Sequence, residues 1–454
     1  MPKSVLTPIA AALALFIGTA HAENLAEVFN AAVKNDPQFL AAQSRRDAAK
    51  ENITQARSAL LPQITGTVNA SRTESTSSGT QIFGGVPFPS DKTTTTTDAE
   101  SISLALNQQL YHHDTWINLS QTEKRVEQAE LSLKGEAQTL VTRVAQAYFD
   151  VLAAQDGVEF SSAELEAVGK QLEQTNQRFQ VGLIAITDVH EAQARYDQTN
   201  ANLIAAQNTL DNAWEALRQI TGQYYQDIAS LNPKFPMSKP DPASADDWIR
   251  VAGENNLTLQ SQRLAVDIAR QEIKRNFAGH LPTLDLSASY SESNSDGDSV
   301  SPSGTSLFDN EGETKRIGVT LTVPIFSGLR TSSQTTQAEH NFEVSTQDLE
   351  RTHRQVVRDS KSAYLGLNAS VSSVRALEQA EVSAQSALEA TQAGFDVGTR
   401  TIVDVLQATS NLFQAKRNLQ RARYDYVLNT LRLKAAAGTI TEQDIMTVNS
   451  WLQP

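Results

Sequence analysis

The sequence contains no cysteine among its 454 residues. This absence excludes a disulfide framework, a thiolate metal site and a cysteine nucleophile. Apolar residues are scarce for a chain of this length, at 40%, so several large globular cores are not expected. Basic residues number 38 against 52 acidic ones, and the resulting net charge of -14 argues against nonspecific binding of nucleic acid. The chain is therefore expected to be extended, with thin layers of helix or sheet.

The N-terminus has the pattern of a secretory signal peptide. Lys3 precedes an apolar stretch from Val5 to Ile17, and Ala20-His21-Ala22 supplies the small residues of a cleavage site. We expect cleavage between Ala22 and Glu23. An uncleaved signal anchor is the alternative, although this apolar run is too short to span a bilayer. No later stretch approaches about eighteen apolar residues, which leaves the periplasm, secretion, or strands that cross an outer membrane.

The chain is predicted to consist of two copies of one unit. Phe179-Gln180-Val181-Gly182 recurs as Phe395-Asp396-Val397-Gly398, and the residues Ile186 to Val189 recur as Ile402 to Val405. Both matches have the same offset of 216 residues. Because several matches follow one another in the same order, they indicate a duplication.

Each copy contains two segments in which apolar and polar side chains alternate. The predicted strands lie at about 62–74 and 99–111 in the first copy and at about 282–291 and 315–327 in the second. Alternation indicates strands whose two faces meet different solvents, and about ten residues suffice for a tilted strand to cross a bilayer. A half-buried strand in a soluble sandwich has the same pattern, so that alternative remains open. Exposed loops rich in Thr, Ser and Gly are predicted between the paired strands, at Ser75 to Asp98 and Ser291 to Thr314.

Four strands are too few to close a barrel, since known membrane barrels have at least about eight. An open sheet edge exposes unpaired backbone groups, which lipid does not tolerate. If these strands span a membrane, several chains must share one barrel.

The remaining sequence is predicted to form long helices. No proline occurs from Asp114 to Arg178, and apolar residues recur every seven positions, as in a coiled coil. The seam consists of Leu119, Val126, Leu133, Leu140 and Ala147 in the first copy and Phe342, Leu349, Val356 and Ala363 in the second. A trimeric coiled-coil adhesin or surface stalk is the alternative architecture, but strands in the middle of both copies argue against it.

Four motifs carry a resemblance to a known family. The chain is similar to the outer-membrane efflux proteins at Arg178 to Asp188 (RFQVGLIAITD), Gln219 to Tyr224 (QITGQY), Gly279 to Leu286 (GHLPTLDL) and Val397 to Leu406 (VGTRTIVDVL). The resemblance implies a mainly α fold with membrane β-structure, in which a homotrimer shares a 12-stranded barrel in outer-membrane lipid and a long α-helical barrel crosses the periplasm. It also implies a passive duct for tripartite drug efflux and type I secretion. The implied partners are a periplasmic adaptor (membrane fusion) protein and an inner-membrane efflux pump or ABC exporter.

The duplication and the resemblance together predict five segments. These are a signal peptide at 1–22, a first repeat at 23–222, a linker and equatorial segment at 223–242, a second repeat at 243–438 and a C-terminal equatorial tail at 439–454.

The resemblance further implies a gate at the periplasmic end. Three copies of Asp404 would form a carboxylate ring that favours cations, whereas Gln407 stands where the family is expected to carry a second acidic ring. The positions that match the closed-state latch are Thr187, Asp188 and Arg400, with Gln171 as a further candidate.

Two latch positions depart from the family pattern. Phe395 replaces an expected Tyr and Gln392 replaces an expected Glu, so Arg400 with Asp188 becomes the main candidate pair. Gly182 and Gly398 are expected to break the helices at a tip where the adaptor docks, although simple helix caps would use the same residues.

Sequence patterns typical of enzymes are incomplete. His190-Glu191 begins like a zinc-protease helix, but Ala194 stands where the second His is required. Gly169-Lys170 is followed by Gln171 and lacks an upstream phosphate loop. His112-His113-Asp114 could bind a metal, but its place directly after a strand favours a polar turn. We therefore expect no enzyme activity, cofactor or metal site.

Overall fold

The computed structural model describes residues 22–89 and 91–453. All of the predicted signal peptide except Ala22 lies outside these residues. The chain divides into two compact units. The first, here called the hairpin unit, contains the chain up to Gln43, Leu133–Leu257 and His353 onward; the second, the strand unit, contains Ser44–Ser132 and Thr258–Thr352. Each unit thus takes segments from both predicted repeats.

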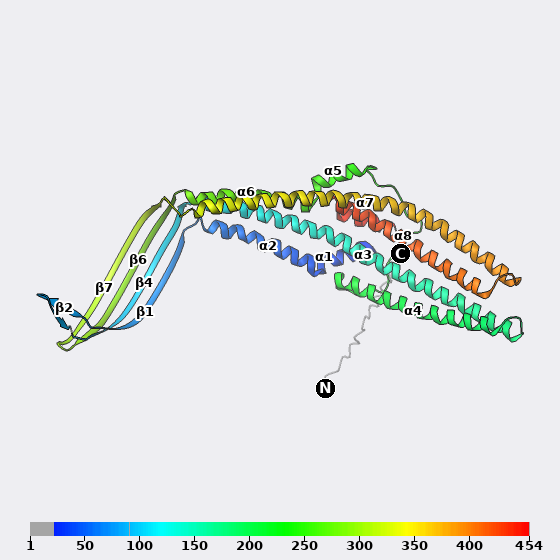
Figure 1. Cartoon of the computed structure of the whole chain (residues 1–454), viewed down its shortest axis with the longest axis horizontal. Helices are drawn as coiled ribbons and strands as arrows, with labels where there is room; N and C mark the ends of the chain where they lie inside the picture. The colour runs from blue at the N-terminus through cyan, green and yellow to red at the C-terminus, as the bar shows by residue number, and fades with distance from the viewer. Residues whose placement is uncertain (1–21, 90, 454) are drawn as a thin grey trace, which may run out of the picture. The chain divides into compact units, whose positions relative to one another are not determined.

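The strand unit contains one antiparallel sheet of four strands in the order β1-β4-β6-β7 (Figure 1). The strands are β1 (Gln63–Ser77), β4 (Thr93–Tyr111), β6 (Thr283–Ser301) and β7 (Gly304–Thr322). Their register aligns Ile64, Leu106, Ala288 and Ile317 in one row across the sheet. The alternating apolar residues of all four strands therefore share one face, as the period of two requires.

The strands are longer at one end than the sequence pattern indicated, and the predicted loops are largely strand. Pairing continues to Ser77 with Thr93 and to Ser301 with Gly304. Only a small separate hairpin, β2 (Thr80–Phe83) with β3 (Val86–Pro89), lies between β1 and β4. The reason is that main-chain hydrogen bonds do not require alternating polarity, and Thr is itself a good strand former. At the other end β7 stops at Thr322, before Pro324, which has no N–H to donate.

Two pairs of helices form most of the hairpin unit, and the first helix of each pair begins in the strand unit and belongs to the hairpin unit from Leu133 or His353 onward. The helices α3 (His113–Gln180) and α4 (Ile186–Thr221) are joined by a short turn, and so are α7 (Arg330–Asp396) and α8 (Ile402–Ala436) (Figure 1). The predicted proline-free helix is thus present as α3, and its seam residues Leu140 and Ala147 are buried. Among the described residues no helix combines the length and the apolarity needed to cross a membrane.

Several short elements complete the hairpin unit. They are α1 (Leu25–Asn35), α5 (Ala245–Asn255), α9 (Glu442–Asn449) and the pair β5 (Ser230–Leu231) with β8 (Leu452–Gln453). Fully buried Tyr148 of α3 directs its hydroxyl to the carbonyls of Ala229 and Glu23, at 2.7 and 3.3 Å. The start of the described chain is therefore packed against the segments that precede α5 and follow α8. The remaining helices are α2 (Pro37–Ser58) and α6 (Leu257–Phe277), followed by a short 3-10 turn at Ala278–His280.

Candidate functional site

The two helix turns of the hairpin unit have the same backbone structure. Gly182 has φ 77°, its N–H donates to the Phe179 carbonyl at 2.8 Å, and the next N–H reaches Arg178 at 2.9 Å. Gly398 has φ 80° and makes the equivalent bonds, to Phe395 at 3.1 Å and from Thr399 to Gly394 at 2.8 Å. Left-handed glycines with this bond pattern terminate helices, so both glycines act as caps here.

Asp404 lies in the first turn of α8, where it forms a capping box with Thr401. The N–H of Thr401 donates to Oδ2 of Asp404 at 3.0 Å, and the N–H of Asp404 donates back to the Thr401 hydroxyl at 3.3 Å. The bond from the Thr401 backbone is the main reason that the pKa of Asp404 lies below 3.8, with further contributions from the Thr401 hydroxyl and Arg400. A carboxylate in the first turn of a helix is also favoured by the helix dipole. Asp404 is therefore held in its charged form at the helix end.

Phe395 is the centre of a small apolar core beneath the turns. Phe395 of α7 is buried with Val168 of α3, Ala192 of α4 and three residues of α8, namely Ile402, Val405 and Leu406. The Arg178 guanidinium lies 4.3 Å from the centre of the Phe395 ring and forms an ion pair with Asp396 at 3.2 Å. Phe395 lacks the hydroxyl of the expected Tyr, and its ring is held instead by burial and by a cation–π contact with Arg178.

The structure does not bring the predicted latch pair together within one chain. Among the residues that the structure describes, Arg400 forms no ion pair with Asp188, and exposed Thr187 has no side-chain hydrogen bond. Asp188 lies in the first turn of α4 and Arg400 in the turn before α8, on separate hairpins, so the predicted link between them stays a prediction for neighbouring copies.

The three glutamines of the predicted site form other hydrogen bonds. Gln171 of α3 donates to the hydroxyl of buried Thr409 on α8 at 3.0 Å. Gln407 donates to Asn411 at 2.8 Å, and Gln392 approaches Asp396 at 3.4 Å, each within its own helix. Of these, only Gln171 connects two helices.

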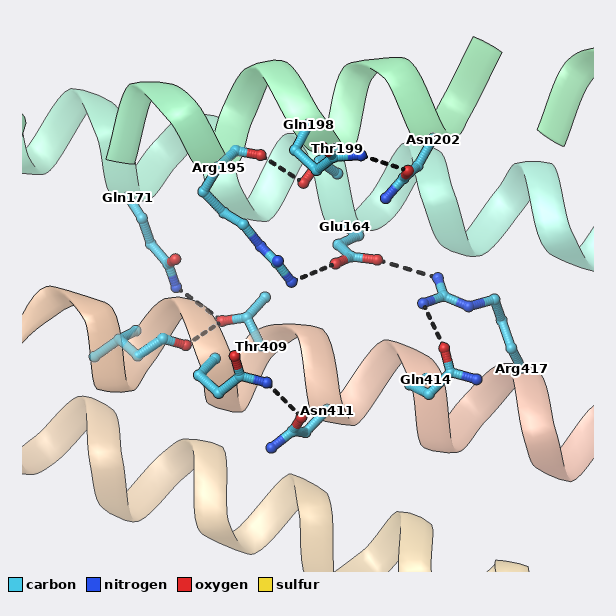
Figure 2. Close-up of polar contacts among 12 residues, drawn as sticks. Glu164, Gln171, Arg195, Gln198, Thr199, Asn202, Thr409, Asn411, Gln414 and Arg417 are labelled. Carbon is cyan, nitrogen blue, oxygen red and sulfur yellow. Dashed lines mark hydrogen bonds and ion pairs between the residues drawn. The ribbon is translucent and has the colours of Figure 1, made fainter. Parts of the chain in front are cut away.

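The sequence reading missed an ionic cluster at Glu164. This residue of α3 is only 3% exposed, and its carboxylate lies 3.5 Å from Arg195 of α4 and 3.1 Å from Arg417 of α8 (Figure 2). If the seven-residue spacing of the seam is continued past Ala147 it reaches Ser161, and Glu164, three positions later, is at a place that is usually apolar in a coiled coil. A charge at that position was the signal that could have identified it.

Apolar side chains are exposed at both turns. Val181 and Leu183 of the first turn are 70% and 73% exposed, and Val397 of the second is 76% exposed. Exposed apolar side chains grouped near a helix end are candidates for contact with another protein.

The His112 motif of the strand unit behaves as a polar turn. Its Nε2 lies 2.9 Å from Oδ1 of Asp285. Within residues 22–89 and 91–453, no three metal-ligating side chains form a group able to hold an ion.

Comparisons with known proteins identify the family. The model of the outer membrane efflux protein family matches residues 28–223 and 248–439. The chain is 44% identical to the outer membrane protein TolC of Vibrio cholerae, with 100% of this chain and 99% of that protein covered, and 42% identical to TolC of Escherichia coli, with 98% and 89% covered. It is 32% identical to the alkaline protease secretion protein AprF of Pseudomonas aeruginosa, with 94% and 86% covered.

Solved structures have the same fold at low sequence identity. A crystal structure of CusC aligns with a TM-score of 0.72 at 18% identity, covering 91% of this chain and 92% of that one. The outer membrane protein VceC of Vibrio cholerae aligns with a TM-score of 0.71 at 20% identity, covering 91% and 96%. The resemblance read from the sequence is thereby confirmed, and the chain belongs to the outer membrane efflux protein family, as an outer-membrane channel of the efflux and secretion type.

Proposed function

We propose that three copies of this chain form a passive duct from the periplasm through the outer membrane, used for tripartite drug efflux and type I protein secretion. The single observation that supports a trimer is that the four-stranded sheet has two open edges. Among the residues that the structure describes, β1 and β7 each pair with a neighbouring strand on one side only. Joining β7 of one copy to β1 of the next, three times, would give a closed barrel of twelve strands and leave no backbone edge in lipid.

The outer surface of such a barrel would be apolar. Ile64 and Val68 of β1 and Ile317 and Val319 of β7 are all exposed in the single chain. Their shared face would meet hydrocarbon, while the alternate polar residues line the lumen. This arrangement supports insertion of the strands in outer-membrane lipid.

The turns of the hairpin unit would form the gate. Three copies of Asp404 around a threefold axis concentrate negative charge at one constriction, which favours cations. Because Gln407 is uncharged, the ring has three carboxylates rather than six. Arg400 and Asp188 do not pair within one chain, so a latch between them would join neighbouring copies in the closed trimer.

The exposed apolar residues at the same turns would bind a periplasmic adaptor. The adaptor would in turn connect the duct to an inner-membrane pump or ABC exporter. The secretion proteins among the relatives, AprF and PrtF of Dickeya chrysanthemi at 31% identity, favour a role in protein export in addition to efflux. The duct itself is proposed to perform no catalysis and to need no cofactor, since the energy would come from the partners.

Single-channel recording of the purified trimer in a planar bilayer tests the duct and its gate. We expect conductance that divalent or trivalent cations block from the periplasmic side. Asp404→Ala should weaken the block, and so should Asp404→Asn, which removes the charge but keeps an oxygen acceptor for the Thr401 N–H.

Thr401→Val is the matched control, because it removes one capping hydroxyl and retains the carboxylate. It should leave the block unchanged. Equal block in the wild type and in Asp404→Asn would reject the carboxylate ring, and a protein without conductance would reject the duct.

A further inference from the structure

We propose that Glu164 is a positioning residue of the gate, and that its carboxylate holds α4 and α8 together through Arg195 and Arg417. This inference rests on the proposed function, since it assigns a role in the closed state of that same duct. Glu164, Arg195 and Arg417 form an ionic connection away from the turns, and none of the three belongs to the predicted latch.

The geometry places one buried carboxylate between two cations on different helices. Oε1 of Glu164 lies 3.5 Å from Arg195 and Oε2 lies 3.1 Å from Arg417, so each oxygen serves one helix (Figure 2). Arg417 is also held by Gln414, at 3.4 Å on its own helix. Both arginines form an ion pair with the same acid, so loss of that acid would remove the ion pair of each.

Burial makes the cluster sensitive to any separation of the helices. The side chain of Glu164 is 5% exposed, whereas those of Arg195 and Arg417 are 29% and 28% exposed. When an arginine moves away, water can hydrate its partly exposed guanidinium, whereas the buried carboxylate of Glu164 stays shielded from water. A buried charge left without its partner is strongly unfavourable. The cluster therefore opposes displacement of α8 from α3 and α4.

The two arginines lie on the helices that begin at the gate. Arg417 follows Asp404 on α8 by thirteen residues, or roughly 20 Å, and Arg195 follows Asp188 on α4 by seven residues, or roughly 10 Å. Because both helices are continuous over these distances, a displacement at the cluster is transmitted to the turns. Glu164 thus fixes how the starts of α4 and α8 stand relative to each other.

The cluster also explains how this chain can remain closed with fewer polar links at the turns. Phe395 has no hydroxyl, Gln392 has no charge, and Arg400 does not pair with Asp188 in the same protomer. The ionic connection that these positions lack is supplied by Glu164 farther along the hairpins.

Single-channel recording of Glu164→Gln tests the inference. Gln is close in size but leaves both arginines without a charged partner, so we expect the ratio of open to closed time to rise by about tenfold or more. The matched control is Glu166→Gln, two residues away on the same helix, whose acid pairs with Lys170 on the exposed surface. It should conduct as the wild type does, because exposed pairs contribute little.

A second variant separates gating from folding. Glu164→Met with Arg195→Met and Arg417→Met keeps the volume and removes all three charges, a change that often preserves stability. We expect this triple variant to form a trimer with wild-type thermal stability and a raised ratio of open to closed time. It tests the inference also in the case that Glu164→Gln alone forms no trimer.

Wild-type gating in either variant, in a protein whose conductance and cation block are intact, would overturn the role of Glu164 and leave the duct in place. Absence of conductance in the wild type would instead overturn the proposed function, and this inference with it.

Discussion

The hydroxyl of Tyr424 on α8 donates a 2.6 Å hydrogen bond to Oδ2 of Asp156 on α3. Burial raises the pKa of Asp156 above 3.8, the Tyr424 bond partly offsets this increase, and Glu159 adds to it. Burial and the nearby Asp156 likewise raise the pKa of Tyr424, so the phenol keeps its proton at neutral pH and donates to Asp156. The pair therefore joins α3 and α8, but it also keeps the Asp156 carboxylate away from water, which is unfavourable for the charged form.

This pair predicts a specific pH dependence of stability. The folded protein binds the Asp156 proton more tightly than the unfolded chain, so the stabilisation is fully present below pH 3.8 and is lost as pH rises through the higher folded pKa. Asp156→Asn has no such titration and still accepts the Tyr424 bond. At neutral pH the variant should denature at the same or a higher temperature than the wild type, and this advantage should shrink as pH falls toward 4.

Thermal denaturation of both trimers between about pH 4 and 7 measures that difference. Asp150→Asn is the control, since Asp150 of α3 pairs with Arg421 of α8 at the exposed surface. An advantage of Asp156→Asn that stays constant with pH would contradict the raised pKa.

Arg400→Ser is predicted to raise the conductance of the isolated trimer. The reason is that Arg400 forms no ion pair with Asp188 among the described residues of its own chain, so its proposed closing contact lies across the interface between copies. Each contact is weak, but three are lost together. Arg250→Ser is a suitable control, because within the described part of the chain the ion pair of Arg250 is with Asp247 on its own helix, at 3.5 Å. Unchanged conductance of Arg400→Ser in planar bilayers would reject the latch.

Local sequence patterns were sufficient to predict the four long strands and the long helices but not their ends, nor the short hairpin of β2 and β3. The seven-residue seam and the absence of proline gave α3 to within two residues of its observed bounds, Asp114 to Arg178 against His113–Gln180. The ends of the strands were missed because Thr93 to Thr97 pair through main-chain groups, which carry no polarity signal.

Contacts between helices were the least predictable part of the site. The Gly182 and Gly398 turns follow from their own sequence, because only glycine adopts positive φ without strain. A charge at a usually apolar position marks Glu164 itself, but its contacts with Arg195 and Arg417 depend on three helices that meet at one point, which is set by packing rather than by a local pattern. The Arg400–Asp188 link also depends on packing between hairpins, and between neighbouring copies it stays a prediction.

Gly398→Ala and Gly438→Ala are predicted to differ strongly in their effect on stability. Both glycines have positive φ, at 80° and 74°. A methyl group at Gly398 meets open space, so the cost is the backbone strain alone, about 1–2 kcal/mol. At Gly438 the new carbon would lie 2.5 Å from the Asn255 carbonyl oxygen, which forces the backbone apart.

Thermal denaturation should therefore show a small decrease for Gly398→Ala and a large decrease, or no trimer, for Gly438→Ala. Equal decreases would contradict the close approach at Gly438. If Gly398→Ala is stable, a pull-down with periplasmic adaptors can then test the proposed docking turn without loss of the fold.

Tyr148→Phe is predicted to loosen the start of the chain without unfolding the helices. The hydroxyl reaches the Ala229 and Glu23 carbonyls, and Glu23 also accepts the Ala229 N–H at 3.0 Å. Removing the hydroxyl leaves buried acceptors with fewer partners, which costs about 1–3 kcal/mol. Hydrogen exchange of the Ala229 amide should accelerate accordingly. Tyr426→Phe removes a buried hydroxyl that contacts Ser238 instead, so exchange at Ala229 that is equally fast in both variants would show that the Tyr148 hydroxyl does not hold this segment.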